Sequence, residues 1–410
     1  MSPWDRIQEL IGIYEERLHR LRKQQAIQGI SVDPGVSIEI QNIEAKIQEL
    51  RTQLVENIKQ DNNPLDSSLN SDLEIESPYG TVSLNSKFYI ERVNDHNCWR
   101  HLHRNRAVTL FVQAPRQMGK SSLMHRMLAR ATNELGRQSV YIDFQKFPTS
   151  YLTKEDDFLI EFCLMIGEAL GIEEAVDDYW RGARTSIRKC SRYVSEYIIP
   201  KISEPIILAM DEIERMLESP FRHDFFAMLR VWHNERAVDE NFARMSLFLS
   251  SSIEPYLLID TPYQSPFNVA MHSLLLDFTP EQVEELNRQH SSPLNSRQVS
   301  DLIDLVAGHP FLIRLTLYLI TIGEFDFDTI LARAIDTDGP FDEHLKHRLL
   351  RVIEKPELKQ ALILVCREQI CENQHFFYEL SGLGLVKRSG QQVIPYNNLY
   401  ARYFQEHLYA

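Results

Sequence analysis

Apolar residues recur every three or four positions within the first sixty residues of the chain, in two separate runs. The first run contains Ile7, Ile11, Tyr14, Leu18 and Leu21, and the second contains Ile40, Ile43, Ile47, Leu50 and Leu54. This spacing places one narrow apolar stripe on each of two helices, and the Pro34-Gly35 pair between them allows the chain to reverse. Residues 1–60 are therefore predicted to form a helical hairpin. Its stripes either pack only on each other or leave apolar surface for a protein partner or a second copy of the chain.

Residues 61–80 change to a polar and acidic composition with few apolar side chains, which predicts a flexible linker. From 81 to 280, short and nearly continuous apolar runs alternate with helical segments. The runs lie at 108–112, 140–144, 206–210, 246–249 and 274–276. Continuous apolar strands separated by helices indicate a parallel sheet covered on both faces, so the predicted fold class is α/β with five strands.

The last third of the chain is predicted to be mainly helical. Thr279-Pro280-Glu281-Gln282 is a capping box with proline at the first helical position, so a helix is expected to start there. No further strand is indicated by the apolar pattern until Val393-Ile394.

The chain has 410 residues, with 44 Lys and Arg against 58 Asp and Glu, for a net charge of −14. This acidic balance argues against a general affinity for nucleic acid or anionic membrane, because both attract basic surfaces. No stretch approaches the roughly 20 apolar residues of a membrane span, and the N-terminus lacks the pattern of a signal peptide. The five cysteines are scattered without disulfide or metal-ligand spacing. We therefore expect a cytoplasmic protein.

The strongest chemical signal is a P-loop pattern between an apolar strand and an amphipathic helix. Backbone N–H groups and the helix N-terminus of such a loop wrap phosphates, so the predicted nucleotide-binding residues are Ala114, Pro115, Arg116, Gln117, Met118, Gly119, Lys120, Ser121 and Ser122. Lys120 would reach the β and γ phosphates, and the Ser121 hydroxyl would ligate Mg²⁺. Ala114 replaces the first glycine of the pattern, which could weaken nucleotide affinity or turnover.

A second element is a buried strand that ends in two adjacent carboxylates. Asp211 is expected to hold Mg²⁺ through its water shell, and Glu212 to orient or deprotonate an attacking water. The N/T-K-x-D signature of guanine-specific GTPases is absent, so the predicted cofactors are ATP and Mg²⁺. The run 250–252 could contribute hydroxyls that sense the γ-phosphate. Cations that could face the phosphates are Arg116, Arg215, Arg230 and Arg244.

Beyond these two motifs, the sequence resembles the bacterial AAA-like ATPases related to the STAND class, the signal-transduction ATPases with numerous domains. The resemblance covers roughly residues 78–408 in collinear order. It rests on the P-loop and Met210-Asp211-Glu212, and on Phe88-Tyr89-Ile90-Glu91-Arg92, Ser252-Ile253-Glu254-Pro255-Tyr256, Ser265-Pro266-Phe267-Asn268-Val269, Gly308-His309-Pro310-Phe311-Leu312-Ile313-Arg314 and Leu399-Tyr400-Ala401-Arg402-Tyr403-Phe404.

The resemblance implies an ATPase domain at 81–280, a helical lid at 281–338 and a winged-helix domain at 339–410. It also implies that Tyr89, Ile90 and Arg92 border the adenine site and that Pro310 closes over the nucleotide from the lid. Arg314, one helical turn after Pro310, would either sense the phosphates or lie on the lid surface. The winged helix offers a candidate recognition helix at 371–380 with two acids and no Lys or Arg, and a candidate wing at 387–392 with two cations.

The expected function is an ATP-dependent molecular switch with slow or conditional hydrolysis. It would couple nucleotide state to self-assembly or to recruitment of a partner through residues 1–60, as in conflict or defence pathways, and a homo-oligomer is expected. Nucleic acid is not an expected partner, and neither is a membrane. Three alternatives stay open, namely a DNA-associated AAA-type ATPase that uses the winged helix, a scaffold that binds nucleotide without hydrolysing it, and a filament or ring that assembles regardless of nucleotide.

Overall fold

The computed structural model describes Lys46, residues 75–259 and residues 262–408. The chain divides into two compact units, Met1–Glu74 and Ile75–Ala410, and the second unit contains every described residue except Lys46. The helical hairpin predicted for residues 1–60 lies outside the described residues apart from Lys46, and so does the linker predicted for residues 61–80 as far as Glu74. Residues 75–80, at the end of that linker, belong to the second unit.

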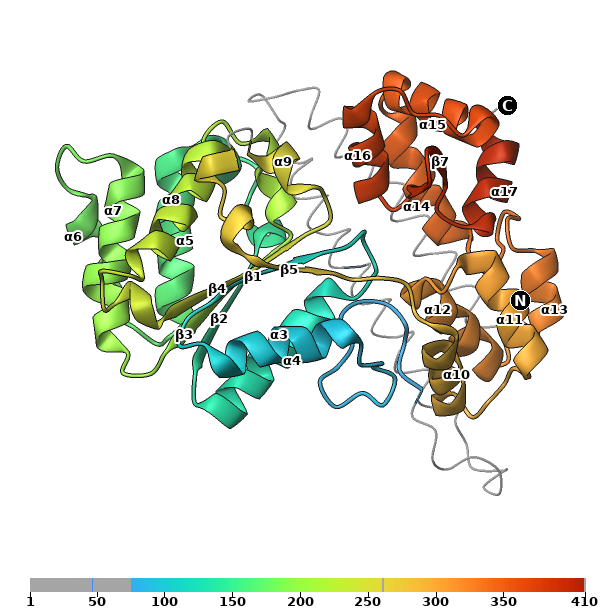
Figure 1. Ribbon diagram of the computed structural model, residues 1–410, viewed down its shortest axis with the longest axis horizontal. Coiled ribbons are helices and arrows are strands. Elements are labelled where there is room, and N and C mark those ends of the chain that lie inside the picture. The colour runs from blue at the N-terminus through green and yellow to red at the C-terminus, as the bar shows by residue number, and fades with distance from the viewer. Residues whose placement is uncertain (1–45, 47–74, 260–261, 409–410) are drawn as a thin grey trace. The chain divides into compact units, whose positions relative to one another are not determined.

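The second unit begins with an α/β part and continues with a helical part (Figure 1). In chain order, the α/β part contains α3 (Val93–Arg104), β1 (Thr109–Gln113), α4 (Lys120–Leu135), β2 (Gln138–Asp143), α5 (Glu155–Ala169), α6 (Val176–Trp180), α7 (Ser186–Arg192), β3 (Ile206–Asp211), α8 (Arg222–Glu235), β4 (Met245–Ser251), α9 (Pro255–Leu258) and β5 (Met271–Leu274). The helical part contains α10 (Pro280–Gln289), α11 (Ser296–Val306), α12 (Pro310–Thr321), α13 (Phe327–Ala332), α14 (Asp342–Ile353), α15 (Pro356–Glu368), α16 (Gln374–Gly382), β6 (Val386–Ser389), β7 (Gln392–Pro395) and α17 (Asn398–His407).

The five strands β1 to β5 form one parallel sheet in the order β2-β3-β4-β1-β5. Figure 1 shows α3 and α4 on one face of this sheet and α5, α7 and α8 on the other. All five strands therefore end at the same edge, which is where ligands bind in open parallel sheets. The predicted α/β class with a five-stranded parallel sheet is confirmed.

Successive residues of each central strand enter two different hydrophobic cores, because side chains alternate between the faces of a sheet. In β1, Leu110 and Val112 pack with α3 and α4, whereas Phe111 packs with α5 and α8. In β4, Phe248 joins the first core and its two neighbours join the second. Burial on both faces explains why these strands read as continuous apolar runs rather than as alternating ones.

Two strands depart from the sequence-based expectation. The run predicted at 274–276 begins three residues too late, since β5 spans Met271–Leu274. This strand lies at the edge of the sheet and has only Ser273 buried, so an apolar run does not mark it. The polar strand β6 is not indicated by the apolar pattern either, because its residues Val386–Ser389 carry one buried side chain.

The helices α10 to α17 share a single hydrophobic core, which also takes in Phe88 and Ile90 from the chain before α3. The predicted helix start at Pro280 is confirmed, with Thr279 and Gln282 closing the capping box. The last segment runs α14, α15, α16 and then the antiparallel pair β6 and β7. This is the element order expected of a winged helix, and the winged-helix assignment stays a prediction.

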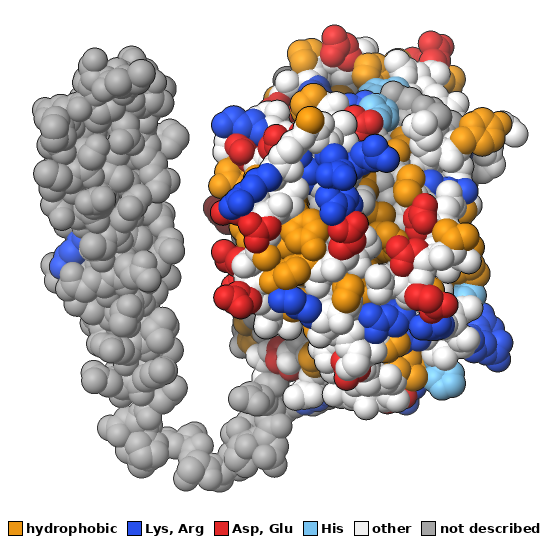
Figure 2. All heavy atoms as spheres, turned by 90° about the vertical axis from the view of Figure 1, so that its left-hand side faces the viewer, with side chains coloured by type: hydrophobic (Ala, Val, Ile, Leu, Met, Phe, Trp, Pro, Cys, Tyr) orange, Lys and Arg blue, Asp and Glu red, His pale blue; other side chains and the backbone are white. Residues whose placement is uncertain are grey.

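The described surface mixes charges of both signs. Figure 2 shows basic, acidic and apolar side chains interspersed on the face that it displays. Among the described residues, no helix combines the length and the apolar character that a membrane crossing requires.

Candidate functional site

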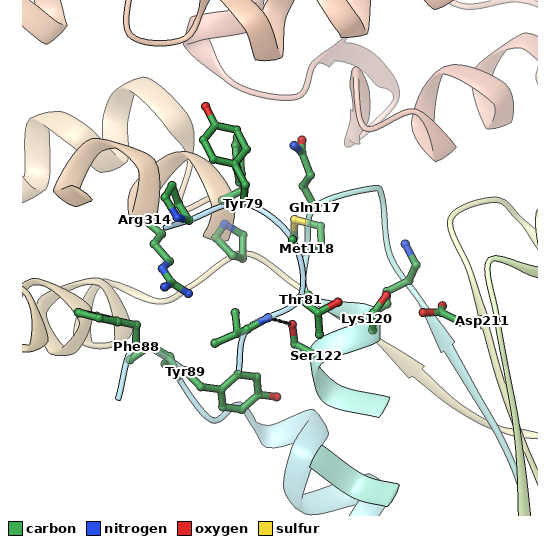
Figure 3. Close-up of a pocket in the computed structure, with 18 of the residues that line it drawn as sticks. Tyr79, Thr81, Phe88, Tyr89, Gln117, Met118, Lys120, Ser122, Asp211 and Arg314 are labelled. Carbon is green, nitrogen blue, oxygen red and sulfur yellow. Dashed lines mark hydrogen bonds between the residues drawn. The ribbon is translucent and has the colours of Figure 1, made fainter. Parts of the chain in front are cut away.

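A cavity of about 410 Å³ lies where the P-loop, the ends of β2 and β3, the chain before α3 and the helix α12 meet (Figure 3). This volume is within the range of ligand pockets. Residues from sequence positions 78 to 314 line it, and they include Tyr79, Thr81, Val82, Phe88, Tyr89, Ile90, Arg92, Gln117, Met118, Gly119, Lys120, Ser121, Ser122, Tyr141, Asp211, Glu212, Pro310, Phe311 and Arg314. In Figure 3, Lys120 and Asp211 lie at one end of the cavity and Phe88 and Arg314 at the other.

The P-loop holds its lysine against its own backbone. Lys120 begins α4 and is 4% exposed, and its Nζ donates to the carbonyl oxygens of Ala114 at 3.0 Å and Pro115 at 3.4 Å. Gly119 has φ +92°, where a side chain is strained, and an added Cβ would lie 3.0 Å from Nη2 of Arg92. Ala114 is fully buried in the core with α3 and α4 and does not line the cavity.

The carboxylate of Asp211 is fixed by three hydrogen bonds at the end of β3. Its Oδ2 accepts from the Tyr141 hydroxyl at 2.7 Å, and its Oδ1 accepts from Ser250 Oγ at 2.6 Å and from the Glu212 backbone N–H at 3.0 Å. Burial raises the pKa of Tyr141, and the neighbouring Asp211 raises it further, so the tyrosine stays protonated and donates. The Asp211 side chain is thus held in one orientation beside Lys120.

Glu212 has a strained backbone and an unusual carboxyl group. Its φ of +55° lies in the left-handed region, which costs a non-glycine residue about 1–3 kcal/mol and is concentrated at functional sites. Burial, followed by the charge of Glu214, raises the pKa of Glu212 to about 7, although Lys120 and Arg116 oppose the shift. Arg116 Nη2 lies 3.4 Å from Oε2 of this carboxylate. A carboxyl with this pKa can exchange a proton near neutral pH.

The residues present fit a magnesium ion that arrives with phosphates, rather than one held by protein alone. Among the described residues, no group of three or more His, Cys, Asp and Glu side chains could hold a metal. Ser121 and Asp211 do line the same cavity as Lys120. One hydroxyl and one carboxylate suit Mg²⁺, which commonly keeps several waters and takes its other ligands from substrate phosphates.

Residues 76–82, which we call the strap, cross the cavity from α12 to α4. Arg314 of α12 forms an ion pair with Glu76 at 3.5 Å and donates to the carbonyls of Glu76 and Ser77, each at 3.4 Å. At the other end, the Val82 N–H donates to Ser122 Oγ at 3.0 Å (Figure 3). The strap is therefore anchored on both sides of the cavity.

The end of the cavity away from Lys120 is aromatic and apolar. The ring of Tyr79 in the strap meets Phe311 edge-on, with centroids 5.6 Å apart, and Pro310 and Ile90 line the same cavity. Arg314 lies over the Phe88 ring at 5.1 Å. A flat apolar space of this kind suits an aromatic base.

Two further residues named from the sequence, Arg92 and Tyr89, make contacts that fix the walls of the cavity. Arg92 is buried, and its Nη1 donates to the Met118 carbonyl of the P-loop at 3.0 Å. The Tyr89 hydroxyl donates to Asp95, and its ring is covered by the guanidinium of Arg126 at 3.9 Å.

The helical part of the unit also touches the P-loop. Arg348 of α14 donates from Nη2 to the Arg116 carbonyl and to Gln117 Oε1, both at 3.0 Å, and from Nη1 to the Leu383 carbonyl at 2.6 Å. Gly384 lies so close to Pro115 that an added Cβ would be 2.9 Å from the proline Cβ. This contact joins the turn after α16 directly to the phosphate loop.

A family model for the AAA-like domain matches residues 77–406, which is most of the chain. The chain belongs to the AAA-like domain family. The AAA-like part of the predicted resemblance is confirmed, whereas the relation to the STAND class stays a prediction.

One curated relative is an uncharacterised WD repeat-containing protein of Synechocystis, 28% identical over 245 residues. The match covers 58% of this chain but 20% of the relative, so the chain spans about a fifth of that protein. Among solved structures, a Walker-type ATPase of Pyrococcus abyssi superposes with a TM-score of 0.52 and 14% identity, covering 77% of this chain and 96% of its own. The Aeropyrum pernix ORC2 protein, in ADPNP–ADP complexes, superposes with a TM-score of 0.46 and 13% identity. The superposition covers 80% of this chain and 98% of the ORC2 chain. At 14% identity the likeness to the Pyrococcus abyssi structure is one of fold.

The AAA-like fold brings most of the predicted site residues into one cavity. The predicted residues that line it are Gln117 to Ser122, Tyr89, Ile90, Arg92, Asp211, Glu212, Pro310 and Arg314. The first three residues of the predicted loop, Ala114, Pro115 and Arg116, do not line it. Arg314 lies at the aromatic end rather than beside Lys120 (Figure 3). Whether each residue binds nucleotide stays a prediction.

The other arginines and serines named from the sequence as possible phosphate contacts do not line the cavity. Arg244 donates to the carbonyls of Ile199, Ile202 and Ser203, and neither Arg215 nor Arg230 lines the cavity of the AAA-like domain. The serines of 250–252 do not line it either, but Ser250 reaches it through Asp211.

Sequence reasoning missed the strap, Tyr141 and Phe311. Tyr79 and Thr81 fall at the border of the predicted linker, and Tyr141 has no motif around it. Phe311 is the one of these residues that the sequence signals, because it directly follows Pro310 within the segment 308–314 that carried the resemblance.

The contact between Gly384 and Pro115 gives a testable prediction on stability. Gly384→Ala is expected to unfold at lower urea concentration than Gly390→Ala, by a further loss of about 1–3 kcal/mol, because overpacking adds to the cost of the backbone. Gly390 is the matched control, since its φ is +61° against +74° for Gly384 and no atom lies within 4 Å of an added Cβ. Equal losses in the two variants would show that the loop at Pro115 accommodates the added methyl group and that Gly384 is not tightly packed against it.

Proposed function

We propose that this AAA-like protein binds ATP with Mg²⁺ in the cavity and acts as a nucleotide-dependent switch. One observation carries the proposal, namely that Lys120, Ser121, Asp211 and Glu212 line a single cavity whose other end is aromatic. Cation, hydroxyl and carboxylates at one end suit a triphosphate with its metal, and aromatic and apolar walls at the other suit a base.

The protein's own groups divide the chemistry between them. The P-loop amides and the N-terminus of α4 would bind the phosphates, and Lys120 would leave its carbonyl partners to contact them. When bound, Mg²⁺ neutralises charge that develops on the transferring phosphate. Asp211, oriented by Tyr141 and Ser250, would hold the waters of that ion. Glu212 would accept a proton from the attacking water.

The cavity is suited to a switch because its walls come from separate parts of the unit. The strap, the lid helix α12 and the P-loop all line it, and the P-loop also touches α14. A ligand that contacts these elements differently in two arrangements shifts the balance between them. We propose that residues 1–60 convey that state to a partner or to a second copy of the chain.

Contacts of α16 support a protein-packing role for the candidate recognition helix. Tyr378 of α16 packs edge-on against Tyr256 of α9, with centroids 4.4 Å apart. An added Cβ at Gly382 would lie 3.0 Å from the Ser252 carbonyl oxygen. The helix therefore rests against the α/β part, and this arrangement favours the switch over the DNA-associated alternative.

The proposal is tested by nucleotide binding and assembly on the purified full chain. Fluorescent ATP and ADP analogues measure affinity, and size-exclusion chromatography with light scattering measures mass with ATP, with ADP and without nucleotide. A switch predicts saturable binding and a mass or elution volume that differs between the nucleotide states. Binding without any such difference would contradict the switch, and absence of binding would contradict the site itself.

The raised pKa of Glu212 predicts a pH dependence of hydrolysis. The carboxylate that accepts a proton is present above its pKa of about 7 and is lost as the pH falls below it. We therefore expect phosphate release to slow as the pH drops through about 7, approaching a tenfold loss per pH unit on the acidic side. The check is kcat/KM for ATP measured across this interval, because that ratio reports the pKa of the protein without nucleotide, and a flat profile would contradict Glu212 as the base.

A further inference from the structure

A second cavity of about 340 Å³ adjoins the first and shares Tyr79, Gln117 and Phe311 with it. Three arginines line this second cavity, Arg116 from the P-loop and Arg348 and Arg351 from α14. The proposed binding and hydrolysis of ATP in the first cavity give it no role.

The arginines are brought together by the contact between α14 and the P-loop. Arg348 is 6% exposed, and its bonds to the Arg116 carbonyl and Gln117 Oε1 hold the helix against the loop. Arg351 lies three residues after Arg348, so it projects from the same face of α14. His347 lies on that face as well and lines the cavity.

Positive charge exceeds negative charge on these walls. Glu343 is the one carboxylate among the residues that line the second cavity, and the carboxylate nearest Arg116 is Glu212, which lines the first. Burial, followed by repulsion from Arg116 and Arg348, lowers the pKa of Arg351, and the charges of Glu212 and Glu354 oppose this shift only in part. Crowded guanidinium groups in a partly enclosed space favour a bound anion, which would relieve that repulsion.

We propose that the second cavity binds a phosphate group through Arg116 and Arg351, in a subsite that links the P-loop to α14. Planar guanidinium groups present paired N–H donors that match phosphate oxygens. The inference rests on the proposed nucleotide site in the first cavity, because a nucleotide bound there gives two sources of phosphate for the second cavity. One is the terminal phosphate of a nucleotide held by the P-loop, and the other is free inorganic phosphate, the product of hydrolysis.

The test uses isothermal titration calorimetry on the full chain and on three variants. Arg351→Gln removes the charge, Arg351→Lys keeps it without the paired donors, and Arg297→Gln removes an exposed arginine of α11 that lines neither cavity. One titration adds inorganic phosphate to protein saturated with ADP and Mg²⁺. A second compares ADP with a non-hydrolysable ATP analogue on free protein.

If free phosphate is the ligand, Arg351→Gln weakens inorganic phosphate about tenfold or more, Arg351→Lys weakens it less, and both nucleotides bind as before. If the terminal phosphate is the ligand, Arg351→Gln weakens the analogue about tenfold or more while ADP is unaffected. Arg297→Gln leaves every affinity unchanged in both cases.

The inference is overturned if Arg351→Gln changes neither the phosphate affinity nor the analogue affinity while ADP still binds. It is also overturned if Arg297→Gln weakens phosphate as much as Arg351→Gln does, since the effect would then come from overall charge. Failure of the unaltered protein to bind ADP would contradict the proposed function instead. In that case, titration of inorganic phosphate into the unaltered protein and into Arg351→Gln without nucleotide would test the subsite by itself, and equal affinities would overturn it.

Discussion

Lys120→Ala is expected to lower the affinity for ATP by about 100-fold or more, because the variant removes a buried cation that would contact the phosphates of the proposed nucleotide. Lys120 is 4% exposed and its Nζ donates to the Ala114 and Pro115 carbonyls. Among the described residues that line the cavity, it is the one lysine. Fluorescent-nucleotide titration of the two proteins measures the difference. Hydrolysis should fall with it.

The matched control is Lys154→Ala, which removes an exposed lysine that pairs with Asp157 at 3.4 Å on the surface. Both variants lose one positive charge, so a general effect of net charge would appear in both. ATP affinity in Lys120→Ala within about threefold of the unaltered protein would contradict the assignment of this loop as the phosphate site.

Glu212→Gln is expected to leave nucleotide binding nearly unchanged and to lower the hydrolysis rate by about 10²- to 10⁴-fold. Glutamine matches the shape of the carboxyl group but cannot accept a proton from water at neutral pH. Glutamine carries the same side-chain length on the backbone at φ +55°, so we expect the variant to keep the fold and to lose only the proton acceptor. Single-turnover release of labelled phosphate measures the rate, and analogue titration measures the binding.

Glu218→Gln provides the control, since Glu218 is exposed in the segment 213–218 that directly follows Glu212 and does not line the cavity. It should hydrolyse ATP as the unaltered protein does. If Glu212→Gln and Lys120→Ala both kept full activity, hydrolysis would have to occur elsewhere. If the unaltered protein bound ATP without releasing phosphate, the scaffold alternative would replace the switch with hydrolysis.

The P-loop and the acidic end of β3 could be predicted from the sequence because each is a contiguous segment with a local physical signature. Lys120 follows a left-handed glycine at the start of a helix, and Asp211 ends a strand with both faces buried. Their meeting in one cavity follows from the parallel sheet, whose strands end at the same edge. These features depend on neighbours within a few residues.

The contacts that hold the remaining walls together could not be predicted, because they join segments far apart in the sequence. Arg314 meets Glu76 across 238 positions, and Arg348 meets Arg116 across 232. Glu76 and Arg348 look like ordinary surface charges in the sequence, and nothing around Arg314 or Arg116 indicates that these two residues are their partners. Burial of such charges becomes favourable only when the folded chain supplies their partners, and no local pattern records that.

The strap also determines how mechanical tension would travel through the molecule. A force applied to the chain before Glu76 would load the ion pair and hydrogen bonds of Arg314 first, and then the hydrogen bond between Val82 and Ser122. Both anchors belong to helices whose residues line the first cavity, α12 and α4. The strength with which this peptide resists being peeled away would then depend on what fills the space beneath it.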